Sequence, residues 1–246
     1  ALSRPRSTSP KSYTNTITVR KSAKRSQMKV AVVNAAIGGI YQTGQKRLRA
    51  SMKEHAPNLD LLAYDNFPAR GYDIANRYNV KAACMEVAMG MGYDILIWCD
   101  ASCVFLADPQ PLIDRIVERG YYLASSGYKA SQTCTDAQLA AAEITRDEAE
   151  HIPDTATGTV GIDLSDCKAN AFLREWIRWS KEGLFAGSRT HDLRDSQDPR
   201  FMFGRQDQAA ATLLAYKYDM SLDALGDLTA YWPGSSRTII AYKGIQ

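Results

Sequence analysis

The sequence has no apolar run of the roughly 18 to 20 residues that a membrane-spanning helix requires. Its N-terminus also lacks the apolar segment of a secretory signal peptide. With 45% hydrophobic and 23% charged residues over 246 positions, the composition is typical of a chain that folds around a sizeable core. We therefore expect one large domain, or one domain with an appendage, without a transmembrane segment.

Cysteine is scarce and dispersed, and no CxxC pair is present. The five cysteines are Cys84, Cys99, Cys103, Cys134 and Cys167. Their odd number argues against a disulfide framework, and the absence of paired ligand spacing argues against a zinc site. We expect reduced thiols in a reducing, cytoplasmic compartment.

Residues 1–27 contain no acidic residue. Their basic residues are Arg4, Arg6, Lys11, Arg20, Lys21, Lys24 and Arg25. Because the whole chain has a formal net charge of +3, the remainder carries −4. The segment is also rich in Ser, Thr and Pro, so we expect a disordered basic tail before a folded domain that spans residues 28–246. The tail is either a solvated extension or an arm attracted to a polyanion such as nucleic acid.

From Met28 onward, buried strand patterns alternate with amphipathic helix patterns. Continuous apolar runs predict strands over residues 29–39, 59–67 and 93–100, and helices follow them over residues 43–57, 79–92 and 108–120. Short, regular alternation of this kind predicts βαβ units. We expect an α/β fold with a mostly parallel central sheet flanked by helices.

Two of these helices carry more detailed signals. In residues 79–92, an apolar stripe is expected at Val80, Cys84, Val87 and Met91. In residues 108–120, Asp108 is the expected N-cap, Pro109 the first helical residue and Gly120 the stop.

The second half of the chain is less regular. Its expected strands span residues 121–128, 158–165 and 237–244, and its expected helices span residues 135–150, 166–183 and 206–220. The helix over 166–183 should bury Phe172, Leu173, Trp176 and Ile177. Residues 186–204 are polar, rich in Arg and Asp, and are expected to form a loop. Trp98, Trp176 and Trp179 are interpreted as packing residues.

Polar and small residues follow the expected parallel strands, where open α/β sheets bind their ligands. The segment "AAIGG" is neither a GxGxxG nor a Walker A motif, which disfavours a dinucleotide-binding or P-loop enzyme. Asn34 and Ala35 after the first strand and Asp65 after the second are candidates for nucleotide binding. Tyr41 is a candidate for stacking on the base. Asp100, which ends "LIWCD", is either a turn residue or the first of the oxygen ligands for a metal-bound phosphate.

Four segments, in the right order, resemble GT-A-fold glycosyltransferases of the glycogenin-like and galactosyl- or mannosyltransferase-like groups. They are "YDILIWCDASCVFLADPQPLID", "TATGTVGIDLSD", "FGRQDQAAATLL" and "RTIIAYKG". The resemblance implies a single GT-A-like domain, with a Rossmann-like nucleotide-binding half and a less regular acceptor half. It also implies transfer of a hexose from a nucleotide sugar, a UDP- or GDP-hexose.

The resemblance also assigns roles to single residues. The first segment corresponds to the Asp-x-Asp motif that holds a divalent metal on the donor diphosphate, which implies Asp100, Ala101 and Ser102. Lys81 falls where such enzymes often carry a basic residue for the diphosphate. Thr157 and Gly158 would shape the pocket for the acceptor and the donor sugar. The implied catalytic residues are Asp207, Gln208 and Asp163.

Two positions depart from the family pattern. Ser102 replaces the second Asp, and Ala241 stands where a metal-binding His would fall. We therefore expect Mn²⁺ or Mg²⁺ to bind weakly at Asp100 and Ser102 with help from the donor, or Lys81 to replace the ion electrostatically. His191 is a minor candidate for a further ligand.

The sequence leaves several alternatives open. The reaction is either inverting, with Asp207 as the base, or retaining. The acceptor is a saccharide, a protein, a lipid-linked sugar or a modified nucleic-acid base. The alternative to an enzyme is a non-catalytic GT-A-like module that binds nucleotide or sugar, or an adaptor for polyanions.

Overall fold

The computed structural model describes residues 28–244. The basic tail expected at residues 1–27 lies outside the described residues. No helix in the described part of the chain is long and apolar enough to cross a membrane.

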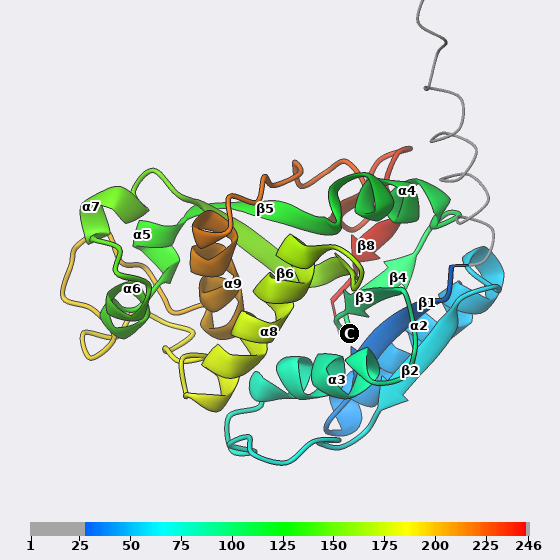
Figure 1. The fold of residues 1–246 in the computed structure, drawn as a ribbon, viewed down its shortest axis with the longest axis horizontal. Coiled ribbons are helices and arrows are strands. Elements are labelled where there is room, and N and C mark those ends of the chain that lie inside the picture. The colour runs from blue at the N-terminus through cyan, green and yellow to red at the C-terminus, as the bar shows by residue number, and fades with distance from the viewer. Residues whose placement is uncertain (1–27, 245–246) are drawn as a thin grey trace, which may run out of the picture.

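A five-stranded central sheet organises the fold (Figure 1). Its strands are β1 (Val30–Ala35), β2 (Asp60–Tyr64), β3 (Ile95–Cys99), β5 (Tyr121–Lys129) and β6 (Pro153–Asp163), in the order β2-β1-β3-β6-β5. β1 pairs in parallel with β2 and β3, whereas β6 is antiparallel to both β3 and β5. Four strands thus run in one direction, which confirms the mostly parallel sheet. The reversed direction of β6 was not predicted.

Helices cover both faces of this sheet (Figure 1). α3 (Asn79–Met89), α8 (Cys167–Lys181) and α9 (Gln206–Lys217) pack on one face. α2 (Gly39–His55) and α4 (Gln110–Arg119) pack on the other. The alternation of side chains along a strand separates the two cores, because successive residues point to opposite faces.

The apolar positions of α8 are confirmed, but those expected for α3 are partly wrong. Phe172, Leu173, Trp176 and Ile177 of α8 are all buried. In α3, by contrast, the buried residues are Asn79, Lys81, Ala82, Ala83, Cys84, Met85 and Ala88, while Met91 is 48% exposed. The reason is that α3 contacts both the sheet and α8, so a wide face rich in small residues is buried instead of a narrow stripe.

Asp108 and Gly120 act at the two ends of α4, as expected. The Asp108 carboxylate accepts a hydrogen bond from the backbone N–H of Gln110, and Gly120 adopts a left-handed conformation with φ 86°. The helix itself begins at Gln110, one residue later than expected, and Pro109 stands at its N-cap.

The exposed helix expected over residues 135–150 is divided into two. α6 (Asp136–Ala142) and α7 (Arg146–Ala149) follow the short α5 (Ala130–Thr133). Thr135 and Thr145 each cap a new helix with a side-chain oxygen, and this second cap in mid-segment prevents one continuous helix.

A second, three-stranded sheet has the order β4-β8-β7. It contains β4 (Cys103–Phe105), β7 (Thr229–Tyr231) and the expected terminal strand β8 (Ile240–Tyr242). The tight turn from β3 into β4 contains residues 100–102. This turn lies against α2, because a side-chain carbon added at Gly44 would come within 2.1 Å of the carbonyl oxygen of Ala101.

This contact predicts that Gly44→Ala destabilises the protein by about 1–3 kcal/mol, because the added methyl group displaces backbone that cannot yield. Gly39→Ala in the same helix is the control, since a side-chain carbon there meets nothing within 4 Å. It should leave the free energy of unfolding unchanged or raise it by up to about 1 kcal/mol. Urea unfolding of both variants measures the difference, and equal stabilities would contradict the packing described here.

Candidate functional site

Two adjoining cavities open where β1 and β3 end. The first has a volume of about 550 Å³ and the second about 340 Å³. Both fall within, or at the lower end of, the range of about 300–1,000 Å³ typical of ligand pockets. The residues that line both cavities are Tyr78, Lys81, Asp100, Arg189 and Asp207.

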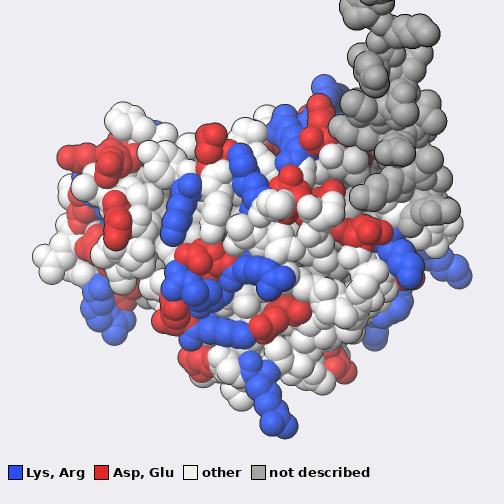
Figure 2. Space-filling model, viewed as in Figure 1, with Lys and Arg blue, Asp and Glu red and all other residues white. Residues whose placement is uncertain are grey.

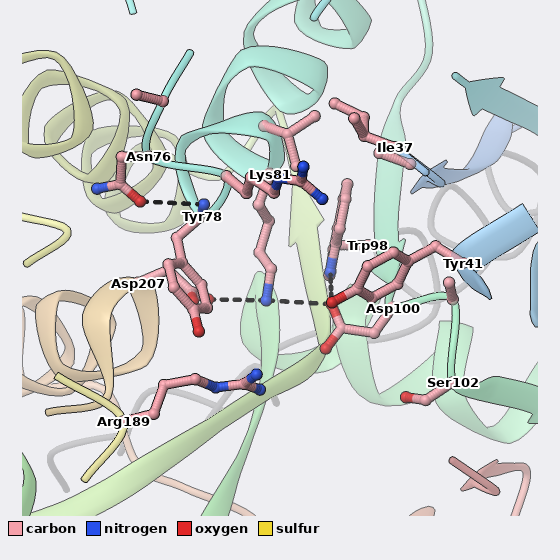
Figure 3. A pocket seen from close by; sticks show the side chains of 15 residues that line it. Ile37, Tyr41, Asn76, Tyr78, Lys81, Trp98, Asp100, Ser102, Arg189 and Asp207 are labelled. Carbon is pink, nitrogen blue, oxygen red and sulfur yellow. Dashed lines mark hydrogen bonds and ion pairs between the residues drawn. The ribbon is translucent and has the colours of Figure 1, made fainter. Parts of the chain in front are cut away.

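Lys81 stands between two carboxylates in this shared wall (Figure 3). Its Nζ lies 2.7 Å from Oδ2 of Asp207 and 3.2 Å from Oδ1 of Asp100. It also donates to the backbone carbonyl of Thr157, at 2.8 Å. The Thr157 hydroxyl in turn donates to Asp207 Oδ2 at 2.7 Å. The ammonium group therefore joins α3, β3, β6 and α9 at one point.

The surroundings keep Lys81 charged. Burial by itself lowers the pKa of Lys81, but the carboxylates of Asp100 and Asp207 outweigh burial and raise the pKa above its ordinary value. Partial burial of the Asp100 carboxylate raises its own pKa, with Lys81 acting in the opposite direction and Asp207 in the same direction. One ammonium and two carboxylates give this ion cluster a net charge of −1 when all three are ionised.

Hydrogen bonds to residues of β3 and β6 hold Asp100 in place. The indole N–H of Trp98 donates to Asp100 Oδ1 at 2.7 Å, and the backbone N–H of Asp100 donates to the carbonyl of Gly158 at 2.8 Å. The Asp100 side chain remains 39% exposed, so its second oxygen is accessible from the cavities. Trp98, expected only to pack, therefore also orients a carboxylate.

Asp207 is the second residue of α9, and the backbone of the first residue of this helix is strained. The preceding residue, Gln206, has a positive φ of 41°, which is uncommon outside glycine. Hydrogen bonds from Gln206 Nε2 to the Gly187 carbonyl and from Gln138 Nε2 to the Gln206 carbonyl hold this conformation. The indole N–H of Trp176 donates to the backbone carbonyl of Asp207. Such strain persists when surrounding contacts determine it, and it concentrates at functional sites.

The first cavity contains most of the residues expected on the nucleotide side. Of these, Ala35, Tyr41, Lys81, Asp100, Ala101 and Ser102 all line it. Sequence reasoning missed Ala75, Asn76, Arg77, Tyr78 and Arg189 as further lining residues. The first four lie in the loop before α3, for which the sequence shows no apolar periodicity.

The second cavity contains the expected pocket residues Thr157 and Gly158, together with Asp207 and Gln208. The amide of Gln208 is turned away to the buried carboxylate of Asp154, at 2.6 Å. Sequence reasoning missed Arg205 here, although it belongs to the segment "FGRQDQ".

Three expected site residues lie elsewhere. Asn34 is fully buried, and its side chain donates to the Cys99 carbonyl, so it ties β1 to β3. Asp65 is exposed and follows the edge strand β2, beyond β1. Asp163 pairs with Ile95 at the start of β3, the opposite end from Asp100, because β6 runs antiparallel. None of the three lines either cavity.

The two other positions considered for metal binding also lie outside the cavities. Ala241 is fully buried in β8 and pairs with Val104. His191 packs on Phe201, with ring centroids 6.0 Å apart. Two residues after Ala241, Lys243 contacts the turn over residues 100–102, because its backbone N–H donates to the Ser102 carbonyl.

The donors present fit a divalent metal only as a weak site. One oxygen of Asp100 is occupied by Trp98 and Lys81, which leaves its second oxygen and the Ser102 hydroxyl. Residues 28–244 contain no group of three His, Cys, Asp or Glu that could hold a metal ion. Any Mg²⁺ or Mn²⁺ here would need phosphate or water oxygens to complete its shell.

No protein-family model and no curated protein matches the chain. Among solved structures, it is similar to the apo structure of the bifunctional glycosyltransferase WbbM, with a TM-score of 0.52 and 11% identity. That similarity covers 88% of this chain and 46% of WbbM, so the chain spans less than half of WbbM. It is also similar to a glycosyltransferase involved in the glycosylation of the major capsid of PBCV-1, with a TM-score of 0.49 and 7% identity over 87% of this chain and 92% of that one. The similarity to WbbM shows the fold: residues 28–244 adopt a GT-A-like glycosyltransferase fold, as the sequence motifs predict.

The ion cluster predicts a specific pattern of stabilities. Lys81→Met should destabilise the protein by about 3 kcal/mol or more, because it leaves the buried carboxylate of Asp207 without its cation. Adding Asp207→Asn to this variant should restore part of the loss, since the stranded charge is then removed. Chemical denaturation measures both variants.

Lys181→Met is the matched control for this prediction. Lys181 pairs with Glu86, and both side chains are 35% exposed. Loss of this surface pair should cost about 1 kcal/mol or less. Similar losses for Lys81→Met and Lys181→Met would contradict a central role for the Lys81 cluster.

Proposed function

We propose that this protein is a glycosyltransferase that moves a hexose from a nucleotide-sugar donor, a UDP- or GDP-hexose, to a hydroxyl acceptor. The observation that carries the proposal is the Lys81 cluster, which lies in the wall between two cavities. A transferase needs two adjacent ligand sites and charged groups at the point where they meet.

The first cavity suits the nucleotide diphosphate. Small side chains at Ala35 and Ala101 let a ligand approach the backbone, and the half-buried ring of Tyr41 can stack on the base. Lys81, Arg77 and Arg189 supply positive charge in the same wall. Fixed cations stabilise the negative charge that develops on a leaving diphosphate.

Asp207 is our candidate for the catalytic carboxylate. Its Oδ2 accepts from Lys81 and Thr157, which leaves Oδ1 for a ligand at the boundary of the cavities. If Asp207 removes the acceptor proton, the anomeric configuration of the product is inverted; a product of retained configuration would exclude that role.

A divalent metal is proposed as a weak participant only. Asp100 and Ser102 would hold Mn²⁺ or Mg²⁺, which would neutralise charge on the diphosphate. The Ser102 hydroxyl in place of a carboxylate is also the feature that favours the alternative, a non-catalytic module that binds nucleotide or sugar.

The acceptor remains a saccharide, a protein, a lipid-linked sugar or a modified nucleic-acid base in this proposal. Figure 2 shows acidic and basic side chains intermingled on the visible face, without a broad patch of one sign. The described residues on that face therefore do not support an adaptor for polyanions. The five cysteines are unpaired, which supports a reducing, cytoplasmic location.

We predict that Asp207→Asn lowers turnover about 100-fold or more, the effect of losing a positioned base, while nucleotide binding is retained. Asp100→Ala should abolish turnover. Ser102→Ala should lower the turnover rate about tenfold, equivalent to about 1.4 kcal/mol of activation free energy. The measurement is release of nucleoside diphosphate from UDP- and GDP-hexoses, with water or a screened sugar as acceptor. Asp65→Asn, outside both cavities, is the control and should be fully active.

The outcome separates the two candidate functions. Donor binding without any donor cleavage in the unmodified protein would support the non-catalytic module. Full activity of Asp100→Ala and Asp207→Asn would show that the chemistry takes place elsewhere.

We further predict that Mn²⁺ binds measurably only when a nucleoside diphosphate is present, since phosphate oxygens must complete its shell. Ser102→Asp adds a carboxylate beside Asp100 and should tighten Mn²⁺ binding about tenfold, which corresponds to about 1.4 kcal/mol. Calorimetric titration of Mn²⁺ with and without the nucleotide measures both effects. Tight stoichiometric Mn²⁺ in the nucleotide-free, unmodified protein would contradict the donor set described above.

A further inference from the structure

Two arginines at the second cavity have no carboxylate partner among the described residues. Arg189 contacts the ring of Tyr78, with its guanidinium carbon 6.0 Å from the ring centroid. Arg205 packs on Phe203 at 4.9 Å and on Tyr128 at 5.6 Å. The Arg205 Nε is buried and has no hydrogen-bond partner. Elsewhere in the described chain, arginines such as Arg115, Arg178 and Arg200 pair with acids.

The backbone fixes both arginines beside the cavity. The N–H of Gly204 donates to the carbonyl of Ser188 at 2.6 Å, so the two ends of the loop meet just before Arg189 and Arg205. This approach requires glycine, because a side-chain carbon at Gly204 would come within 2.6 Å of the Gly187 Cα. The guanidinium of Arg205 is further restrained by its two aromatic neighbours, which lowers the entropy cost of binding a ligand.

The charge of the cavity wall is therefore positive despite its two acids. The Lys81 cluster contributes −1, and Asp100 and Asp207 are the only acids that line the second cavity within the described residues. Arg189 and Arg205 change the sign of this wall to a net +1. The hydroxyl groups of a neutral sugar can accept hydrogen bonds from these guanidinium groups, but only an anion also offsets their buried charge.

We infer that the second cavity binds an acceptor saccharide that carries an anionic group, a carboxylate or a phosphate, held by Arg205 with Arg189 at the rim. Guanidinium groups bind such anions through paired, charge-assisted hydrogen bonds. The inference rests on the proposed function, and it narrows the acceptor to acidic sugars. Arg205 is the discriminating residue, because it lines the second cavity but not the first, whereas Arg189 lines both.

The test compares binding of glucuronate, glucose 6-phosphate and glucose to the full chain, loaded with UDP or GDP, by ligand-observed NMR. We expect at least one acidic sugar to bind about tenfold or more tightly than glucose, as one charge-assisted pair allows. The two acidic probes distinguish a carboxylate site from a phosphate site. Arg205→Gln should abolish the preference, and Arg205→Lys should weaken it, because a lysine cannot form the paired contact.

Arg189→Gln is a second variant, and it should fold normally because Arg189 is exposed. Since Arg189 also lines the first cavity, this variant is measured at saturating UDP or GDP, where it should reduce the preference. Arg49→Gln, at an exposed position of α2, is the matched control and should change nothing. Binding of UDP or GDP should be unchanged in Arg205→Gln, which separates this inference from the proposed function.

Four results would overturn the inference. Equal binding of acidic and neutral sugars would show that the arginines do not select an anion. A loss of nucleoside diphosphate affinity in Arg205→Gln would assign Arg205 to the donor diphosphate. A loss of affinity for UDP-glucuronate but not UDP-glucose would assign it to the donor sugar. If a single-stranded oligonucleotide binds through Arg205 and acidic sugars do not, the acceptor is a nucleic acid instead.

Discussion

The ammonium group of Lys81 is the point on which the architecture of the site depends. It links α3 to the end of β3, to β6 and to the start of α9. A buried lysine with two carboxylates is costly to desolvate, and such a cluster is weak grounds for stability alone. Its value lies in placement, because the same cation fixes both carboxylates. An indole N–H also holds the carboxylate of Asp100, and a second indole N–H holds the backbone carbonyl of Asp207.

The reversed strand β6 explains how the site acquires its two cavities. Since β6 runs against β3, residues from its middle, Thr157 and Gly158, reach the edge where β3 ends. The strand end itself, with Asp163, is carried to the opposite edge. A fully parallel sheet would have placed a strand end and its following loop there. The reversal instead makes room for α9 and the loop before it, which together form the second cavity.

The distribution of charge around the site follows from these constraints. The acids of the site are neutralised in part by Lys81. Arg189 lies in the loop over residues 186–204 and Arg205 directly follows it, and neither arginine meets an acid among the described residues. Cations that remain without a partner inside a concave wall are available to a ligand. This arrangement connects the fold to the proposed chemistry on both sides: negative diphosphate in the first cavity and an anionic acceptor in the second.

Local patterns in the sequence determined the five strands of the central sheet, the helices on both of its faces and the position of Asp100, because burial periodicity and strand ends are properties of short segments. They did not predict β4 and β7, the short partners of β8. The ordered motifs also predicted the GT-A-like fold and brought Lys81, Asp100, Thr157 and Asp207 into one proposed site. What the sequence could not determine was strand direction, which removed Asp163 from the site, and edge position, which removed Asp65. Nor could it show that Asn34 points into the sheet or that Arg189 and Arg205 converge. These outcomes depend on pairings between residues far apart in the chain, and a pattern of neighbouring residues carries no information about which distant segment lies beside it.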